Sequence, residues 1–147
     1  MAMYRIGYAP GAFDLLHVGH LDLFRKAKSR CDFLIAGVAS DEIVLQNKGA
    51  PPTIPLAERL EIIRSLKLVD VAFPTMTWNK REMWEALRFH LLFKGDDWRG
   101  TEKGERLERE FMFVDVEIVY VPRTIQTSST ALRRAMQALE KLATQRI

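Results

Sequence analysis

Short apolar segments alternate with helical patterns along the 147 residues of this chain, and this alternation restricts the fold more than any other feature. Each segment has the length and the aliphatic and aromatic content of a buried strand. Strands separated by helices are typical of βαβ units, which place parallel strands in one sheet. We therefore expect a single α/β domain over residues 1–147, with a mostly parallel five-stranded sheet and helices on both faces. The expected strands are residues 4–9, 32–39, 69–74, 91–95 and 116–122.

Four helical patterns lie between and after these strands. Apolar residues recur at helical spacing in residues 18–30, 55–67 and 79–90, the last of which ends on His90. The C-terminal pattern is the clearest, because its apolar residues trace a single face. That face consists of Leu132, Ala135, Met136, Leu139, Leu142 and Ala143.

Polar segments follow four of the five expected strands. Because parallel strands end at one edge of a sheet, where α/β proteins bind their ligands, we expect these segments to meet in space. They are residues 11–20, 40–48, 95–98 and 123–130. The segment "NKGAPPTIP", residues 47–55, has the composition of a solvated loop and is interpreted either as a lid or as a plain connector.

The composition restricts the partners of the chain. The net charge of +3 suits an anionic ligand but is too small for a dedicated nucleic-acid-binding protein. Cys31 is the single cysteine, so no disulfide within the chain is possible, and we interpret it as a core residue. No apolar run approaches the length of a membrane span. We expect a soluble, cytoplasmic protein that binds neither nucleic acid nor membrane.

The decapeptide "GAFDLLHVGH", residues 11–20, holds two histidines at a spacing of three. His17 and His20 would lie on one side of a helix that starts near Val18, beside its free N–H groups, and Gly11 would let the backbone turn tightly. This arrangement favours binding of a phosphate. The pattern favours a metal site less, because a catalytic zinc needs a third ligand and only His90 and Cys31 have comparable softness. The remaining alternative is that the histidines merely cap the helix.

Two further segments carry chemistry. Arg123 can clamp phosphate oxygens, and the hydroxyls of Ser128, Ser129 and Thr130 can cap the last helix or face a phosphate. Asp97, in "KGDDWRG", can accept a hydrogen bond from an exocyclic base amine or a ribose hydroxyl. Both cytosine and adenine carry such an amine, so this chemistry does not choose the base.

These segments resemble known signatures. The pattern G-x-F-D-x-x-H-x-G-H in residues 11–20 resembles the signature of the cytidylyltransferase-type nucleotidyltransferases, which have a Rossmann-like α/β fold. The stretch "PRTIQTSST" looks like their second signature, with Gln126 in place of a glycine and Thr127 in place of an aliphatic residue. The string G-D-D-W is similar to that of the glycerol-3-phosphate cytidylyltransferases, enzymes of teichoic-acid precursor synthesis.

The resemblance implies that CTP and a small phosphorylated acceptor bind here, that a nucleotidyl group is transferred, and that pyrophosphate leaves. It implies catalytic roles for His17, His20, Lys48 and Arg123, and acceptor contacts for Lys48, Trp78 and Arg81. It also implies Mg²⁺ carried by CTP, without a dedicated metal site, and a homodimer. The nucleotide-binding positions it implies are Ala12, Phe13, His17, Gly19, His20, Asp97, Arg123, Thr124, Thr127, Ser128, Ser129 and Thr130.

The chain departs from the family pattern at Ala12, where a threonine is usual, and at Lys67, where an arginine is usual. Three alternatives therefore stay open beside transfer to glycerol-3-phosphate. They are a cytidylyltransferase for another phospho-alcohol or a phosphonate, an adenylyltransferase of the same superfamily, and an inactive nucleotide-binding module.

Overall fold

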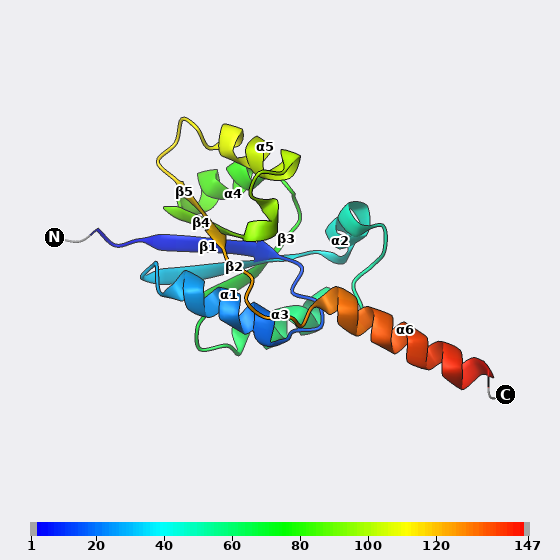
Figure 1. Cartoon of the computed structure of the whole chain (residues 1–147). Coiled ribbons are helices and arrows are strands. Elements are labelled where there is room, and N and C mark those ends of the chain that lie inside the picture. The colour runs from blue at the N-terminus through cyan, green and yellow to red at the C-terminus, as the bar shows by residue number, and fades with distance from the viewer. Residues whose placement is uncertain (1–2, 146–147) are drawn as a thin grey trace.

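A parallel five-stranded sheet with the order β3-β2-β1-β4-β5 forms the centre of the computed structural model, which describes residues 3–145 (Figure 1). The expected α/β fold is confirmed, and every strand begins within two residues of its expected start. The strands are β1 (Ile6–Gly11), β2 (Phe33–Ala39), β3 (Val71–Thr75), β4 (Leu91–Gly95) and β5 (Glu117–Val121).

The strand order reverses between β1 and β4, and these two strands pair only over a short distance. The register joins Gly7 to Leu91 and Tyr8 to Leu92, whereas β2 pairs with β1 over the whole length of β1. Beyond Tyr8 the carboxyl ends of β1 and β4 therefore separate. Such a topological switch point is where open α/β sheets bind ligands.

The helices are α1 (Val18–Lys28), α2 (Asp41–Lys48), α3 (Leu56–Arg64), α4 (Lys80–Leu87), α5 (Glu102–Glu110) and α6 (Ser129–Gln145), with a single 3-10 turn η1 (Asp96–Trp98). Phe24 of α1 and Ile63 of α3 are buried against one face of the sheet. Leu107 of α5 and the aromatic residues Tyr8 and Phe89 form a second core on the other face, where α4 also packs. Helices thus cover both faces, as expected (Figure 1).

The expected helix 79–90 ends earlier than its periodicity predicts. Arg88 adopts a left-handed conformation, with φ of 53°, and terminates α4 at Leu87. His90 therefore lies outside the helix, where its Nδ1 accepts a hydrogen bond from the backbone N–H of Ile6 at 3.0 Å. The third histidine of the chain ties β1 to the start of β4, away from residues 11–20.

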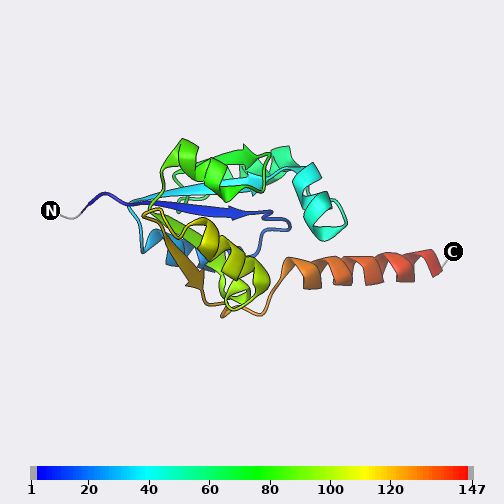
Figure 2. The ribbon, with the colours of Figure 1, turned by 90° about the horizontal axis from the view of Figure 1, so that it is seen from above.

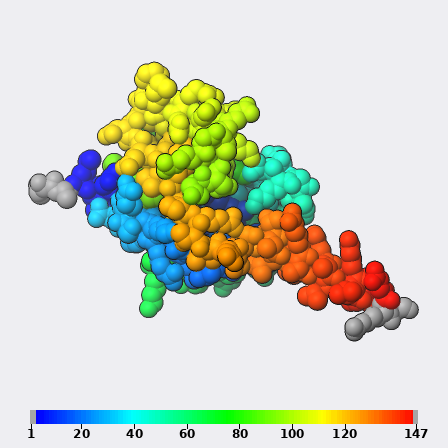
Figure 3. Space-filling view, viewed as in Figure 1, coloured from blue at the N-terminus to red at the C-terminus, as the bar shows by residue number. Residues whose placement is uncertain are grey.

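Helix α6 is present, but its apolar face does not pack on the core. None of its described residues is buried, and Leu139 and Leu142 are 66% and 58% exposed. The helix leaves the sheet and projects into solvent (Figures 2 and 3). Among the described helices, none combines the length and the apolar character that crossing a membrane requires.

Candidate active site

His17 and His20 cap the start of α1 and hold each other in place. The Nδ1 atom of His17 accepts a hydrogen bond from the backbone N–H of Gly19 at 3.0 Å, and Nδ1 of His20 accepts one from the backbone N–H of His17 at 3.2 Å. The ring centroids lie 4.0 Å apart. Two of the N–H groups that were expected to face an anion are thus used by the histidines. Because each Nδ1 is an acceptor, the proton of each neutral ring is on Nε2.

Burial and nearby positive charge keep both imidazoles neutral. Burial lowers the pKa of His20 to about 4, and the charges of His17, Lys48 and Arg123 act in the same direction. The pKa of His17 is also lowered, first by burial and then by Arg123. Each neutral ring can donate one hydrogen bond through Nε2, and an anionic ligand would raise both pKa values again.

The glycine between the histidines makes this packing possible. A Cβ at Gly19 would lie 2.6 Å from Cε1 of His17, which is closer than real side chains approach. The His17 ring can therefore fold back over the helix start only because residue 19 has no side chain. The expected sharp turn at Gly11 is wrong: Gly11 belongs to β1, and the left-handed residues of this loop are Phe13 and Leu15.

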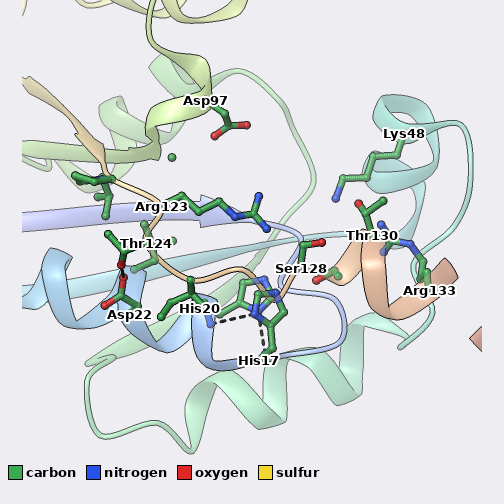
Figure 4. A pocket seen from close by; sticks show the side chains of 17 residues that line it. His17, His20, Asp22, Lys48, Asp97, Arg123, Thr124, Ser128, Thr130 and Arg133 are labelled. Carbon is green, nitrogen blue, oxygen red and sulfur yellow. Dashed lines mark hydrogen bonds between the residues drawn. The ribbon is translucent and has the colours of Figure 1, made fainter. Parts of the chain in front are cut away.

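His17 and His20 line a cavity of about 360 Å³ at the carboxyl edge of the sheet (Figure 4). The side chains of Lys48, from α2, and Arg123, which follows β5, extend into this cavity. The carboxylates of Asp22 and Asp97 also line this cavity. Asp22 forms an ion pair with Lys26 at 2.7 Å, so the carboxylate of Asp97 remains available to a ligand. Positive groups thus dominate the wall, which suits a polyanion. The cationic or imidazole side chains are those of His17, His20, Lys48, Arg123 and Arg133.

The segment 123–130 passes over this cavity and begins α6. Within residues 3–145, Arg123 donates one hydrogen bond, to the carbonyl of Thr127 at 3.4 Å, and the hydroxyl of Ser128 accepts one from the N–H of Ala131 at 3.1 Å. The cavity is lined by Arg123, Thr124, Ser128, Ser129 and Thr130, whereas Thr127 does not line it. The backbone at Gln126 does not adopt a positive φ. The loop therefore forms without the glycine that the family pattern has at this position.

Asp14 anchors this site from within the protein, a role that the sequence did not reveal. Its buried carboxylate accepts hydrogen bonds from the N–H groups of Thr53 and Ile54 and pairs with Arg133 at 3.0 Å. Its carbonyl accepts a hydrogen bond from the hydroxyl of Ser129. Asp14 therefore joins the histidine loop to α6 and to the end of segment 47–55. Burial disfavours its ionised form, but the hydrogen bonds and Arg133 outweigh burial and lower its pKa.

A buried arginine supports the same loop from the other side. Arg59 of α3 is 1% exposed, and its guanidinium donates to the carbonyls of Ile54, Ala12 and Ala39, each at 2.7 Å. It also pairs with Asp41 at 2.6 Å. The backbone at Ala12, which leads into the histidine loop, is therefore fixed by the core.

A second cavity, of about 290 Å³, continues from the first toward β4. Ala12 and Phe13 line it, and His20, Lys48 and Asp97 line both cavities. The site residues expected from residues 11–20, 48, 97 and 123–130 thus meet at one edge of the sheet, and Thr127 is the exception that lines neither cavity. Lys94, which was not expected to take part, also lines the second cavity.

Of the three residues expected to contact the acceptor, Lys48 lines both cavities, whereas Trp78 and Arg81 line neither of them. Trp78 lines a narrow recess of about 30 Å³ next to the second cavity, together with Lys80 and Lys94. Arg81 borders none of these three cavities; its guanidinium donates to the carbonyl of Glu110 at 2.8 Å and joins α4 to α5. The structure therefore brings Trp78 near the site and leaves Arg81 outside it.

Within residues 3–145, no three histidine, cysteine or carboxylate side chains come close enough to form a metal site. Cys31 packs against the edge of the core, as interpreted from the sequence.

A parallel α/β sheet with neutral histidines and cationic side chains at its switch point is suited to a ligand that carries phosphates. The Cytidylyltransferase-like family matches residues 8–135. The chain therefore belongs to this family of nucleotidyltransferases.

Individual relatives agree with this membership. The glycerol-3-phosphate cytidylyltransferase of Bacillus subtilis (strain 168) is 31% identical over 131 residues, which are 88% of this chain and 95% of that protein. The FAD synthase of Pyrococcus abyssi is 47% identical over 60 residues, which are 41% of this chain and 40% of that protein. The crystal structure of the lipopolysaccharide core biosynthesis protein from Thermoplasma volcanium GSS1 superposes with a TM-score of 0.72 at 25% identity, over 84% of this chain and all of that one.

Proposed function

We propose that this protein transfers CMP from CTP to a small phosphorylated acceptor and releases pyrophosphate, and that the acceptor is glycerol-3-phosphate, giving CDP-glycerol. The observation that carries the proposal is the pair of neutral histidines whose Nε2–H groups face a cationic cavity. The choice of CTP and of the acceptor is supported by the similarity to glycerol-3-phosphate cytidylyltransferases over most of both chains.

The chemistry is an in-line displacement at the α-phosphorus of CTP. An oxygen of the acceptor phosphate forms the new bond to phosphorus, while the bond to the bridging oxygen of the β-phosphate breaks. The electron pair of that bond leaves with pyrophosphate. A phosphate monoester is largely dianionic at neutral pH, so the nucleophile needs no general base and no covalent intermediate. Catalysis then depends on positioning and on stabilisation of the charge on the leaving group.

The side chains around the cavity are suited to these tasks. His17 and His20 donate to phosphate oxygens from rings whose orientation is set by their caps, so no reorganisation is needed during the reaction. Arg123 and Lys48 bring positive charge from opposite sides of the cavity (Figure 4). These four residues are the proposed catalytic groups, and the segment 128–130 holds the phosphates beside them.

We propose that Mg²⁺ enters with CTP. The described residues offer no cluster of metal ligands, and the cavity wall is mainly cationic, so phosphate oxygens would supply most of the ligands. Asp97 is the carboxylate on the wall that is free to contact the ion or the ribose. Bound Mg²⁺ would neutralise charge on the leaving pyrophosphate.

A screen for pyrophosphate release tests this proposal. CTP and ATP are each combined with glycerol-3-phosphate, other phospho-alcohols and a phosphonate. Release that needs CTP and is fastest with glycerol-3-phosphate supports the proposal, and release with ATP would favour an adenylyltransferase. Saturable binding of CTP without release from any acceptor would identify an inactive nucleotide-binding module.

We further propose that the protein acts in the cytoplasm, where CTP is made, and that it forms a homodimer. The apolar residues of α6 support the second proposal. Leu132, Leu139 and Leu142 lie on one exposed face of a helix that projects from the protein, and such a face is typical of an interaction surface.

A further inference from the structure

Lys94 is a partly buried lysine at the carboxyl end of β4 with no carboxylate partner. In the described part of the chain, neither Lys94 nor its neighbour Lys80 has an acidic side chain within the 4.0 Å of an ion pair. Lysines are seldom buried unless their charge is compensated. Two such lysines together therefore indicate that something outside the protein supplies the negative charge.

An aromatic ring holds these lysines in place. The Nζ atom of Lys94 lies 4.0 Å from the centroid of the Trp98 ring, and that of Lys80 lies 5.2 Å from the same centroid. A cation over an indole face gains some electrostatic attraction, but it makes no hydrogen bond there. The N–H groups of the Lys94 ammonium thus remain free to bind an anion, while the stem of the side chain is fixed.

The position of Lys94 separates it from the nucleotide phosphates. His20 and Lys48 line both the first and the second cavity, so they lie where two substrates would meet. Lys94 lines the second cavity and the recess with Trp78, but it does not line the first cavity. With CTP in the first cavity, the second cavity, which Lys94 lines, remains for the acceptor.

We propose that Lys94 binds the phosphate of the acceptor, with Lys80 as a second positive charge behind it and Trp98 as its support. This inference rests on the proposed function, because it assigns the second cavity to the acceptor. It adds a substrate-binding residue at a position where no motif predicted one. It also implies that the acceptor must be an anion at this point, so a neutral polyol would not bind.

The charge of Lys94 is sensitive to pH in the neutral range. Burial, together with the charges of Lys80, Lys103 and Lys48, lowers the pKa of Lys94 to about 7, while Asp97 acts in the opposite direction. The protonated form binds an anion, so binding of the acceptor should weaken as the pH rises through this pKa. His20 stays neutral over the same range, because its pKa is about 4.

Steady-state kinetics of Lys94→Met test the assignment. Loss of one charge-assisted contact should raise KM for glycerol-3-phosphate by about 10- to 100-fold and leave KM for CTP within about threefold. The matched control is Lys103→Met, because Lys103 is exposed, lies 5.8 Å from the same ring and borders none of the three cavities. An increase in KM for CTP instead, or unchanged constants, would overturn the proposal.

The pH profile of Lys94→Arg separates substrate binding from a structural role. In the wild type, kcat/KM for the acceptor should fall about tenfold per pH unit above the pKa of Lys94. An arginine stays protonated, so the variant should lose this decrease while still using the acceptor near pH 7. A profile in the variant that matches the wild type would contradict the role of Lys94.

Binding without turnover distinguishes failure of this inference from failure of the proposed function. Inorganic phosphate is titrated against the protein without CTP, and the fluorescence of Trp78 and Trp98 reports on the lysine site. The His17→Ala background weakens phosphate binding at the histidines. Saturable quenching that Lys94→Met removes and Lys103→Met keeps would support the anion site even if no acceptor is turned over. Equal quenching in all variants would refute it.

Discussion

The Nδ1 atom of His20 accepts a hydrogen bond from the backbone N–H of His17 at 3.2 Å, so the second histidine caps the residue that carries the first. Because His17 also caps the helix through its own Nδ1, neither ring can rotate without breaking a cap. The two Nε2–H groups are therefore fixed toward the cavity. Capping uses the Nδ1 edge of each ring and leaves the Nε2–H edge free for the proposed binding of phosphate, so the two alternatives that the sequence offered are compatible.

Asparagine variants separate these two roles. In His17→Asn and His20→Asn, the side-chain oxygen can replace Nδ1 as the cap acceptor, but nothing replaces Nε2–H. We expect kcat to fall by about two orders of magnitude, as for removal of a transition-state donor, with little change in the melting temperature. His90→Asn is the matched control, because His90 makes the same kind of contact far from the cavity. Near-normal kcat in both site variants would exclude the histidines as phosphate donors.

The Asp14 anchor predicts a dependence of stability on pH. The pKa of Asp14 is lowered in the folded protein, so its carboxylate stabilises the fold above the unfolded pKa of about 4 and loses this effect as the pH falls through the folded value. Asp14→Asn should lower the free energy of unfolding by about 1–3 kcal/mol at pH 7 and flatten its decrease toward acid. Urea unfolding from pH 7 to pH 3 measures both effects. Asp115→Asn, at an exposed carboxylate, should change neither; equal curves for Asp14→Asn and wild type would contradict the anchor.

Replacing Arg59 is expected to lower the stability of the protein strongly, although no substrate contacts this residue. Arg59→Met removes the guanidinium donor from three carbonyls and leaves Asp41 with the N–H of Leu56, which should cost about 3–5 kcal/mol of stability. Arg59→Lys should recover only part of this loss, because an ammonium cannot reproduce the planar fork. Urea unfolding provides the measurement, with Arg64→Met on the same helix as control, since Arg64 makes a single contact to the carbonyl of Ala72. A loss no greater than that of the control would show that the buried network contributes little.

The exposed face of α6 predicts the oligomeric state. Leu139→Glu places a charge in the middle of the apolar face and should convert a dimer into a monomer. Gln137→Glu adds the same charge on the opposite side of the helix and should leave the dimer intact. Size-exclusion chromatography with light scattering over a range of concentrations decides the result. A monomeric wild type, or a dimer that tolerates Leu139→Glu, would refute pairing through α6.

Local patterns in the sequence predicted most of the elements. The strand segments are short and rich in apolar residues, and their ends lie within a few residues of the observed ones. Two helices were missed for physical reasons. In α5 the sequence "EKGERLERE" has one apolar side chain, Leu107, so it lacks a visible apolar period. In α2 the helix is eight residues long, and its two buried residues, Ile43 and Val44, are adjacent.

The sequence by itself determined the strand–helix alternation, the histidine pair and the expectation that polar segments meet at the carboxyl edge, because these depend on spacing along the chain. Only the tertiary structure decided which groups face each other across that edge. Asp14 meets Arg133 because α6 begins above the histidine loop, and Arg81 joins Glu110 because α4 packs on α5. Lys94 reaches the cavity because β1 and β4 separate beyond Tyr8. These contacts depend on the order of the strands in the sheet, and the periodicity of a single segment does not encode that order.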